Sequence, residues 1–228
     1  MVQQSAFIIT IDGPSGAGKG TVSASLALRL GFALLDSGAL YRLTGLAARL
    51  SACDFEDHAA LGDVARTLDV EFRSSEHGVT IYLSGQDVSR AIRTEQAGMD
   101  ASKVAAVPAV RDALLQRQRD FAEAPGLVAD GRDMGSTVFP EAPLKVFLTA
   151  SAEERANRRL KQLQLANAEQ EYDYQQILSD IEARDKQDSE RSSSPLAAAA
   201  DAIHIDSSQM TIEEVLTKIL DLYRACCD

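Results

Sequence analysis

The chain has 228 residues, of which 45% are hydrophobic and 25% charged, as is ordinary for one globular domain with a substantial core. Its net charge of −11 argues against nucleic acid or an anionic membrane as a partner, so a phosphate site would need locally concentrated cations. No apolar stretch approaches the roughly 20 residues that span a bilayer, and no signal-peptide pattern opens the chain. The three cysteines form no disulfide framework, so we expect free thiols and a cytoplasmic location. We also expect a monomer.

Five short apolar runs predict buried strands, at 7–12, 33–36, 127–130, 144–149 and 202–206. Helical patterns lie between most of them, which favours a parallel sheet covered on both faces. Four of the runs end at or beside an aspartate or a glycine-rich turn. These ends share the carboxyl edge of the sheet, where such folds bind ligands.

The first run leads into the stretch around which the chain is organised. A β-branched strand, a glycine-rich turn and a helical pattern follow one another, which is the context that a phosphate loop requires. Glycines allow the backbone N–H groups to turn inward around an anion, and the helix N-terminus adds partial positive charge. The residues expected around the phosphates of a nucleoside triphosphate are Gly13, Pro14, Ser15, Gly16, Ala17, Gly18, Lys19, Gly20 and Thr21.

Two residues of this stretch have expected roles. Lys19 can reach the β- and γ-phosphates, and the hydroxyl of Thr21 can approach a magnesium ion. The hydroxyl comes one place later than in the usual motif, because Gly20 directly follows the lysine. The alternative is a glycine-rich strand–helix turn without a ligand, which the register of loop, lysine and flanking elements disfavours.

Residues 68–89 break the pattern with alternating apolar and polar positions. A hairpin loop is predicted at 74–78 and a second turn at 85–86. No helix of crossover length separates these runs, so we expect a small antiparallel sheet inserted between the second and third core strands.

The rest of the chain is predicted to be mainly helical. The expected segments are a helix over 104–122 interrupted by Pro108, a helix opened by a capping-box-like start at 151–154, a polar and mobile segment over 161–174, a helix over 174–190 stopped by 192–195, and a closing helix over 211–226. The helix over 174–190 places five residues on one face, namely Ile177, Ile181, Arg184, Asp188 and Arg191.

Arginines gather at strand ends and along helix faces. Arg42 and Arg132 follow the second and third core strands, and Arg155, Arg158 and Arg159 share a helix face. In an acidic chain such arginines are candidate phosphate clamps, although a surface ion pair remains the alternative for each one. Asp130 ends the third strand, either as a carboxylate directed toward the metal or as an ordinary turn aspartate.

The sequence offers no candidate general base for activating a hydroxyl or a water. A phosphate monoester is already largely a dianion at neutral pH and needs no base. The difficulty of transfer to such an acceptor is repulsion between two anions. Lysine, arginines and magnesium address that difficulty.

Three further motifs accompany the phosphate loop: Leu-Asp-Ser-Gly-Ala-Leu-Tyr-Arg at 35–42, Ala-Asp-Gly-Arg-Asp-Met-Gly at 129–135, and Arg184-x3-Asp188-x2-Arg191. With Gly-Pro-Ser-Gly-Ala-Gly-Lys-Gly-Thr at 13–21, they resemble the bacterial cytidylate kinases, a family of nucleoside monophosphate kinases. The similarity extends over essentially the whole chain.

The resemblance implies an α/β fold of the P-loop NTPase class, with a five-stranded parallel sheet in the order 2-3-1-4-5. It implies a core over about 1–36, 104–160 and 176–228, an acceptor-binding region over about 37–103 and a lid over about 161–175. The implied reaction is phosphorylation of CMP and dCMP by ATP with Mg²⁺, giving CDP and dCDP.

Site residues follow from the same resemblance at matching positions. Those implied at the base are Ser37, Arg111 and Asp133; at the sugar, Ser102, Arg184 and Asp188; and at the acceptor phosphate, Arg42, Arg132 and Arg191. The implied catalytic set is Lys19, Asp130, Arg132, Arg158 and Arg184, with Arg155 and Arg158 at ATP. Which lid arginine reaches the transferring phosphoryl group stays open.

The chemistry of cytosine agrees with this assignment. Its 4-amino group donates, while N3 and O2 accept, and uracil reverses the 4-position and N3. A carboxylate such as Asp133 and a guanidinium such as Arg111 would separate the two bases by hydrogen-bond polarity. Two alternatives remain: a related kinase for another small acceptor, and a nucleotide-dependent switch, for which a guanine-reading Asn-Lys-x-Asp run is missing.

Overall fold

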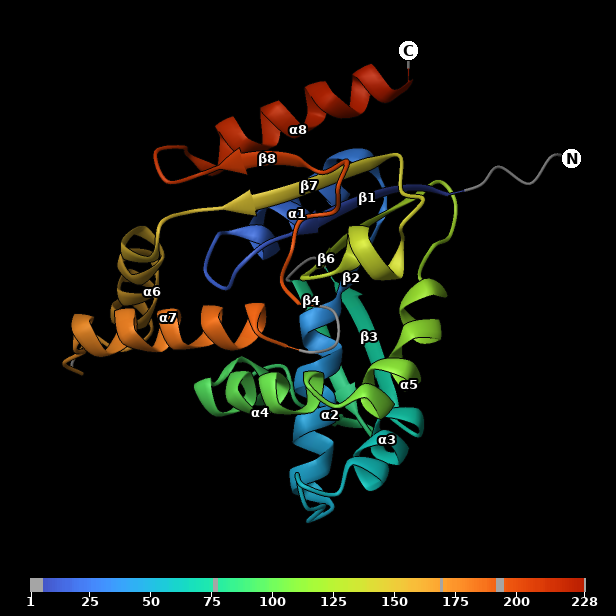
Figure 1. Ribbon diagram of the computed structural model, residues 1–228, viewed down its shortest axis with the longest axis vertical. Coiled ribbons are helices and arrows are strands. Elements are labelled where there is room, and N and C mark those ends of the chain that lie inside the picture. Colours follow the sequence, from blue (N-terminus) through green and yellow to red (C-terminus); the bar gives the residue numbers. More distant parts are fainter. Residues whose placement is uncertain (1–5, 76–77, 169, 192–194, 228) are drawn as a thin grey trace, which may run out of the picture. The chain divides into compact units, whose positions relative to one another are not determined.

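The computed structural model describes residues 6–75, 78–168, 170–191 and 195–227 (Figure 1). The chain forms two compact units. The first comprises residues 1–35 and 121–228, and the second comprises residues 36–120.

The first unit is built on a five-stranded sheet, whose strands are β1 (Phe7–Asp12), β2 (Ala33–Asp36), β6 (Gly126–Gly131), β7 (Leu144–Thr149) and β8 (Ile203–Asp206). Their order is β2-β6-β1-β7-β8, which confirms the predicted order 2-3-1-4-5 of the core strands. β1 pairs in parallel with β6 and β7, and β7 pairs in parallel with β8. The carboxyl ends of these strands therefore meet at one edge.

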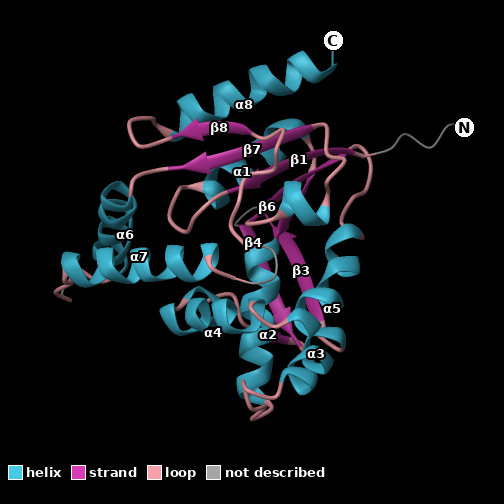
Figure 2. Ribbon diagram, in the orientation of Figure 1, coloured by secondary structure: helices cyan, strands magenta, loops and turns pink. Residues whose placement is uncertain are grey.

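Helices of the first unit follow the strands in alternation (Figure 2). They are α1 (Lys19–Leu30), the π-helical turn η2 (Met134–Val138), α6 (Ala152–Ala166), α7 (Tyr174–Ser189) and α8 (Ile212–Cys227). α1 and α8 cover one face of the sheet, and their apolar residues Val22, Leu26, Val215 and Ile219 join those of the strands in one buried core. α6 and α7 pack against each other.

The second unit combines helices with the small sheet. Its elements are α2 (Ser37–Leu50), α3 (His58–Arg66), β3 (Val70–Ser75), β4 (Gly78–Leu83), β5 (Gln86–Asp87), η1 (Ala91–Arg93), α4 (Glu95–Ala105) and α5 (Pro108–Arg119). β3-β4-β5 is the antiparallel sheet that the alternating pattern predicts. The unit has a core of its own, in which Leu43 of α2 packs with Leu68, Ile81 and Ile92.

Some boundaries differ from those predicted. The helix expected over 104–122 is two helices, because Pro108 begins α5 rather than interrupting one element. α4 starts at Glu95, earlier than the pattern indicates, with the side chain of Thr94 capping the N–H of Ala97. The second compact unit continues through α5 to Asp120.

Two predicted loops also differ. β3 and β4 extend into the expected hairpin loop at 74–78, of which residues 76–77 lie outside the described residues. Residues 161–166, expected in the polar segment, form the last turns of α6. The segment 192–195, predicted to end the preceding helix, falls mostly outside the described residues.

Among the described residues, no helix combines the length and the apolar character needed to cross a membrane.

Two leucines of α1 should differ in how much they contribute to the free energy of unfolding. Leu26 is fully buried against the sheet, whereas the side chain of Leu28 is 85% exposed. We expect Leu26→Ala to lower the free energy of unfolding by about 2–5 kcal/mol through lost burial and a residual cavity. Leu28→Ala should change it by less than about 0.5 kcal/mol. Urea denaturation followed by circular dichroism measures both, and equal effects would contradict the placement of α1.

Candidate active site

The phosphate loop joins β1 to α1 at the carboxyl edge of the sheet. Gly13 and Gly18 have backbone φ angles of +147° and +92°, which residues other than glycine rarely adopt. At Gly13 a Cβ would also lie 2.0 Å from the carbonyl oxygen of Leu148, so this position has no room for a side chain. α1 begins immediately at Lys19, with Gly18 as its N-cap and no side chain capping its first N–H groups. An uncapped helix N-terminus of this kind is suited to binding an anion.

Lys19 lies inside this loop. Its Nζ donates to the carbonyl oxygen of Pro14 at 2.9 Å, and the residue is only 6% exposed. Burial lowers the pKa of Lys19 to about 8, and the positive charges of Arg132 and Arg184 contribute, against the opposing effect of Asp130. The lysine is therefore buried near two other positive charges, which the carboxylate of Asp130 opposes.

Asp188 holds two of the predicted arginines. Its Oδ2 accepts from Nε of Arg132 at 2.8 Å, and Nη2 of Arg191 lies 3.3 Å from its Oδ1. Burial alone would raise the pKa of Asp188, but Arg132 and Arg191 outweigh it and keep that pKa below its usual value. Arg184 adds to this effect from the same helix, α7. The structure thus brings Lys19, Arg132, Arg184 and Arg191 into one cationic group.

Asp12 anchors the turn that carries Arg132 and Asp133. Its two carboxylate oxygens accept the backbone N–H groups of Met134 and Gly135, each at 2.8 Å. Burial raises the pKa of Asp12 to about 6, although these two N–H groups act in the opposite direction. The sequence interpretation gave Asp12 no role beyond ending a strand. Its position directly before the first loop glycine was the available signal.

Asp130 and Thr21 are the candidate ligands of a metal. Asp130 is 8% exposed, and its Oδ2 lies 3.5 Å from where a Cβ on Gly20 would be, next to Thr21 in the first turn of α1. Among the described residues, no group of three or more histidine, cysteine, aspartate or glutamate side chains could hold a metal ion. One carboxylate and one hydroxyl beside a phosphate loop suit Mg²⁺, which usually completes its shell with water and substrate phosphates.

Arg155 reaches the phosphate loop from α6. Its Nη1 donates to the carbonyl oxygen of Ser15 at 3.1 Å, and its Nε donates to that of Ala150 at 2.9 Å. The same guanidinium forms a bidentate pair with Asp185 of α7, with distances of 3.0 and 2.5 Å. Asp185 was not among the predicted site residues, although it directly follows Arg184.

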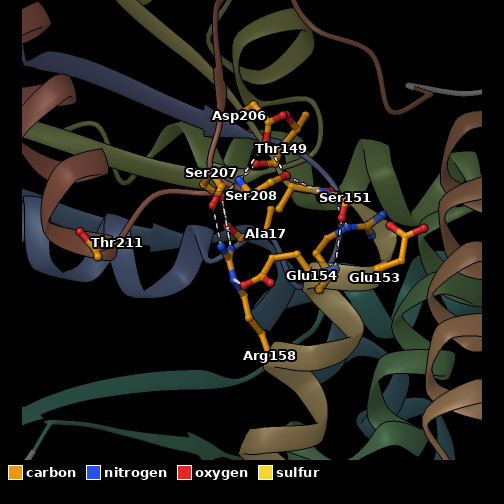
Figure 3. A network of polar contacts seen from close by, with 12 residues as sticks. Ala17, Thr149, Ser151, Glu153, Glu154, Arg158, Asp206, Ser207, Ser208 and Thr211 are labelled. Atoms are coloured by element: carbon orange, nitrogen blue, oxygen red, sulfur yellow. Dashed lines mark hydrogen bonds and ion pairs between the residues drawn. The ribbon is translucent and has the colours of Figure 1, made fainter.

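Arg158 reaches the loop one turn later (Figure 3). Its Nη1 lies 3.3 Å from the carbonyl oxygen of Ala17 and 3.2 Å from Oγ of Ser207, and its Nη2 donates to the carbonyl oxygen of Ser207 at 2.6 Å. Glu154 accepts from its Nε at 2.9 Å. Arg155 and Arg158 therefore both contact backbone carbonyls of the loop.

Four of the predicted residues, Ser37, Arg42, Ser102 and Arg111, belong to the second unit. Ser37 is 3% exposed, and its hydroxyl donates to Oε1 of Gln118 at 2.7 Å. The hydroxyl of Ser102 donates to the carbonyl oxygen of Gly98 at 3.2 Å. Gln118 is itself 1% exposed, and nothing in its sequence context marked it as a partner of a site residue.

Two arginines of this unit are also held in place. Nη1 of Arg42 donates to the carbonyl oxygen of Ile92 at 2.7 Å. The guanidinium carbon of Arg111 lies 5.8 Å from the centre of the Tyr41 ring, a cation–π arrangement, and its Nη1 lies 3.4 Å from the carbonyl oxygen of Ala105.

A glycine-rich strand–loop–helix cradle, a buried lysine and a group of arginines define a kinase of the P-loop class. Comparison with known proteins narrows this class, since the family model for cytidylate kinase matches residues 9–225. The chain belongs to the cytidylate kinase family and is a nucleoside monophosphate kinase.

Similar curated proteins include the cytidylate kinase of Saccharophagus degradans, 56% identical over 220 residues that cover 96% of this chain and 98% of that one. The cytidylate kinase of Pseudomonas aeruginosa strain LESB58 is 57% identical over 215 residues, or 93% of each chain. Among solved structures, the shikimate kinase of Bacteroides thetaiotaomicron aligns over 97% of this chain and 99% of its own, with 12% identity and a TM-score of 0.45. Similarity at that level does not bear on function.

The charges around Lys19 predict how its pKa responds to substitution. Arg132→Met removes a neighbouring positive charge and should raise the pKa of Lys19 from about 8 toward its ordinary value, whereas Asp130→Asn should lower it. NMR titration of protein with ¹³C-labelled lysine side chains measures this pKa, with Lys19→Arg assigning the signal. A Lys19 that titrates normally in the unaltered protein would contradict the described cationic group.

Proposed function

We propose that this enzyme transfers the γ-phosphoryl group of ATP, with Mg²⁺, to the 5′-phosphate of CMP and dCMP, giving ADP with CDP or dCDP. The observation that carries this proposal is the cationic group of Lys19, Arg132, Arg184 and Arg191 at the phosphate loop. Such a group suits a reaction in which two phosphate anions must approach each other. The relatives named cytidylate kinase support the choice of acceptor.

Each cation has a task in this proposal. Lys19 leaves the carbonyl oxygen of Pro14 and binds the transferring phosphoryl group, where the added negative charge favours its protonated form. Arg132 and Arg191 bind the acceptor phosphate, and Asp188 holds their guanidinium groups in position. Arg184 neutralises charge that develops between donor and acceptor. No general base is required, because the acceptor phosphate is already largely a dianion.

Thr21 and Asp130 would hold the magnesium ion together with phosphate oxygens and water. When bound, the ion supplies charge neutralisation at the phosphates. The fit rests on the hydroxyl in the first turn of α1 and on the carboxylate beside Gly20.

Base recognition falls to residues outside the cationic group. We assign Asp133, which is 3% exposed, to accept from the 4-amino group of cytosine, and Arg111 to donate to N3 and O2. Ser37 also contacts the base in this proposal, while Ser102 and Asp188 lie near the sugar and Arg42 near the acceptor phosphate. In this proposal the acceptor-binding region comprises about residues 37–103, and about residues 161–175 act as the lid over ATP, where Arg155 and Arg158 enter from α6.

The cellular setting is part of the same proposal. We place the reaction in the cytoplasm, which the three free cysteines support. We propose a monomer whose partners are its nucleotide substrates, with neither nucleic acid nor membrane bound, in keeping with the net charge of −11.

An acceptor panel tests the proposed reaction. Purified protein with ATP and magnesium is assayed for ADP formation with CMP, dCMP, UMP and AMP, and with Lys19→Ala protein as a control for contaminating kinases. CMP and dCMP should be the best acceptors, and Lys19→Ala should reduce turnover by about 10²-fold or more. A higher kcat/KM with UMP or AMP, or full activity after chelation of magnesium, would overturn the assignment.

Substitutions that separate CMP from UMP give a sharper prediction. Contacts to phosphate and ribose are common to both acceptors and cancel in the ratio of their kcat/KM values. Asp133→Ala and Arg111→Met should each reduce the preference for CMP about tenfold or more, since a mismatched buried partner costs about 1–3 kcal/mol. Arg132→Met is the matched control and should weaken both acceptors equally. If Asp133→Ala depressed CMP and UMP in parallel, Asp133 would have a structural role rather than a role in base recognition.

A further inference from the structure

The phosphate loop is held from outside through its carbonyl groups. Arg155 donates to the carbonyl oxygen of Ser15, and Arg158 and Ser207 both lie 3.3 Å from that of Ala17. Arg158 comes from α6 and Ser207 from the turn after β8, so the same carbonyl is contacted from two elements that are distant in sequence (Figure 3).

The direction of the Ala17 carbonyl determines that of the next N–H group. In a trans peptide the C=O of one residue and the N–H of the following residue point in opposite directions. A carbonyl of Ala17 held toward Arg158 and Ser207 therefore turns the N–H of Gly18 away from these two side chains. Glycine permits more than one orientation of this peptide at little cost, so the local sequence alone does not fix it.

Ser207 is suited to fix that orientation. It is 2% exposed, its N–H donates to the carbonyl oxygen of Thr149 at 2.8 Å, and its own carbonyl oxygen accepts from Arg158 at 2.6 Å. Its hydroxyl oxygen lies 3.2 Å from Nη1 of Arg158 and 2.9 Å from the carbonyl oxygen of Thr149. The single hydroxyl proton is shared between the carbonyls of Thr149 and Ala17, while the hydroxyl oxygen accepts from Arg158.

We propose that Ser207 is a positioning residue of the phosphate loop, which acts with Arg158 to keep the Ala17 carbonyl turned outward and the Gly18 N–H turned toward the bound phosphates. The inference rests on the proposed use of this loop for the triphosphate of ATP. Ser207 contacts no substrate in this role, and its contribution should be to donor binding rather than to acceptor binding.

Ser207→Ala tests the proposal by removing the hydroxyl and leaving both backbone hydrogen bonds of residue 207 in place. The KM for ATP should rise about fivefold or more, while the KM for CMP changes less than twofold. Ser208→Ala is the matched control, because the hydroxyl of Ser208 bonds to Asp206 and to the N–H of Ser151 instead of the loop. Ser208→Ala should leave the KM for ATP unchanged. A KM for ATP within twofold of the unaltered enzyme in Ser207→Ala, or a parallel rise of both KM values, would overturn the proposal.

Two further measurements keep the test decisive. If Ser207→Ala does not fold, Ser207→Cys retains a small side chain with weaker hydrogen bonding and should show a smaller rise in the KM for ATP. No rise would overturn the proposal.

The second measurement is the binding of inorganic tripolyphosphate, followed by calorimetry, which needs no acceptor. This binding should weaken in Ser207→Ala but not in Ser208→Ala. Weakened binding together with absent CMP turnover in the unaltered protein would refute the proposed reaction and leave the role of Ser207 standing. Tripolyphosphate binding that is absent, or equal in the two variants, would overturn that role.

Discussion

Electrostatic repulsion between positively charged side chains that are partly removed from water is the main constraint on the candidate active site in the first unit. The charges of Arg132 and Arg184 both act on Lys19, and those of Arg132, Arg184 and Arg191 all act on Asp188. Repulsion among such cations grows as solvent is excluded. Asp130 and Asp12 offset part of this repulsion at Lys19, whose pKa is nevertheless lowered, mainly by burial and further by Arg132 and Arg184. In the proposed reaction, the phosphates of the substrates bring further negative charge to these cations.

The sheet makes this arrangement possible because it fixes residues that repel one another. β1 ends at Asp12 and β6 ends at Gly131, and the two strands lie side by side in register. Asp12 then bonds to the backbone that follows Arg132, so the turn after β6 is fixed by the strand before the phosphate loop. A shift of β6 against β1 would therefore move Arg132 and Lys19 relative to each other, which explains why a carboxylate is buried at this junction despite its raised pKa.

The features that could be predicted from the sequence are those that depend on a pattern of neighbouring residues. Strand positions, the phosphate loop and the small antiparallel sheet follow from periodicity and glycine spacing, and the order of the strands followed from resemblance to a known family. The missed features are contacts between distant residues: Asp12 with the turn at Met134, Ser37 with Gln118, and Arg158 with Ser207. Each joins residues at least 49 positions apart through an ordinary polar side chain, and such a pairing leaves no periodic signal. The split at Pro108 was missed for a different reason, since proline both interrupts helices and begins them.

Asp188 has contacts in the structure that its expected place near the sugar does not account for. Resemblance implies a place near the sugar, and its carboxylate faces Arg132 and Arg191. A carboxylate that orients two guanidinium groups restricts their rotamers before substrate arrives, so less conformational entropy remains to be lost on binding. Its depressed pKa keeps it charged across the neutral range, and this orienting effect therefore persists wherever the acceptor phosphate is itself a dianion. Contact with the sugar and orientation of the arginines are compatible, because a carboxylate has about four acceptor positions.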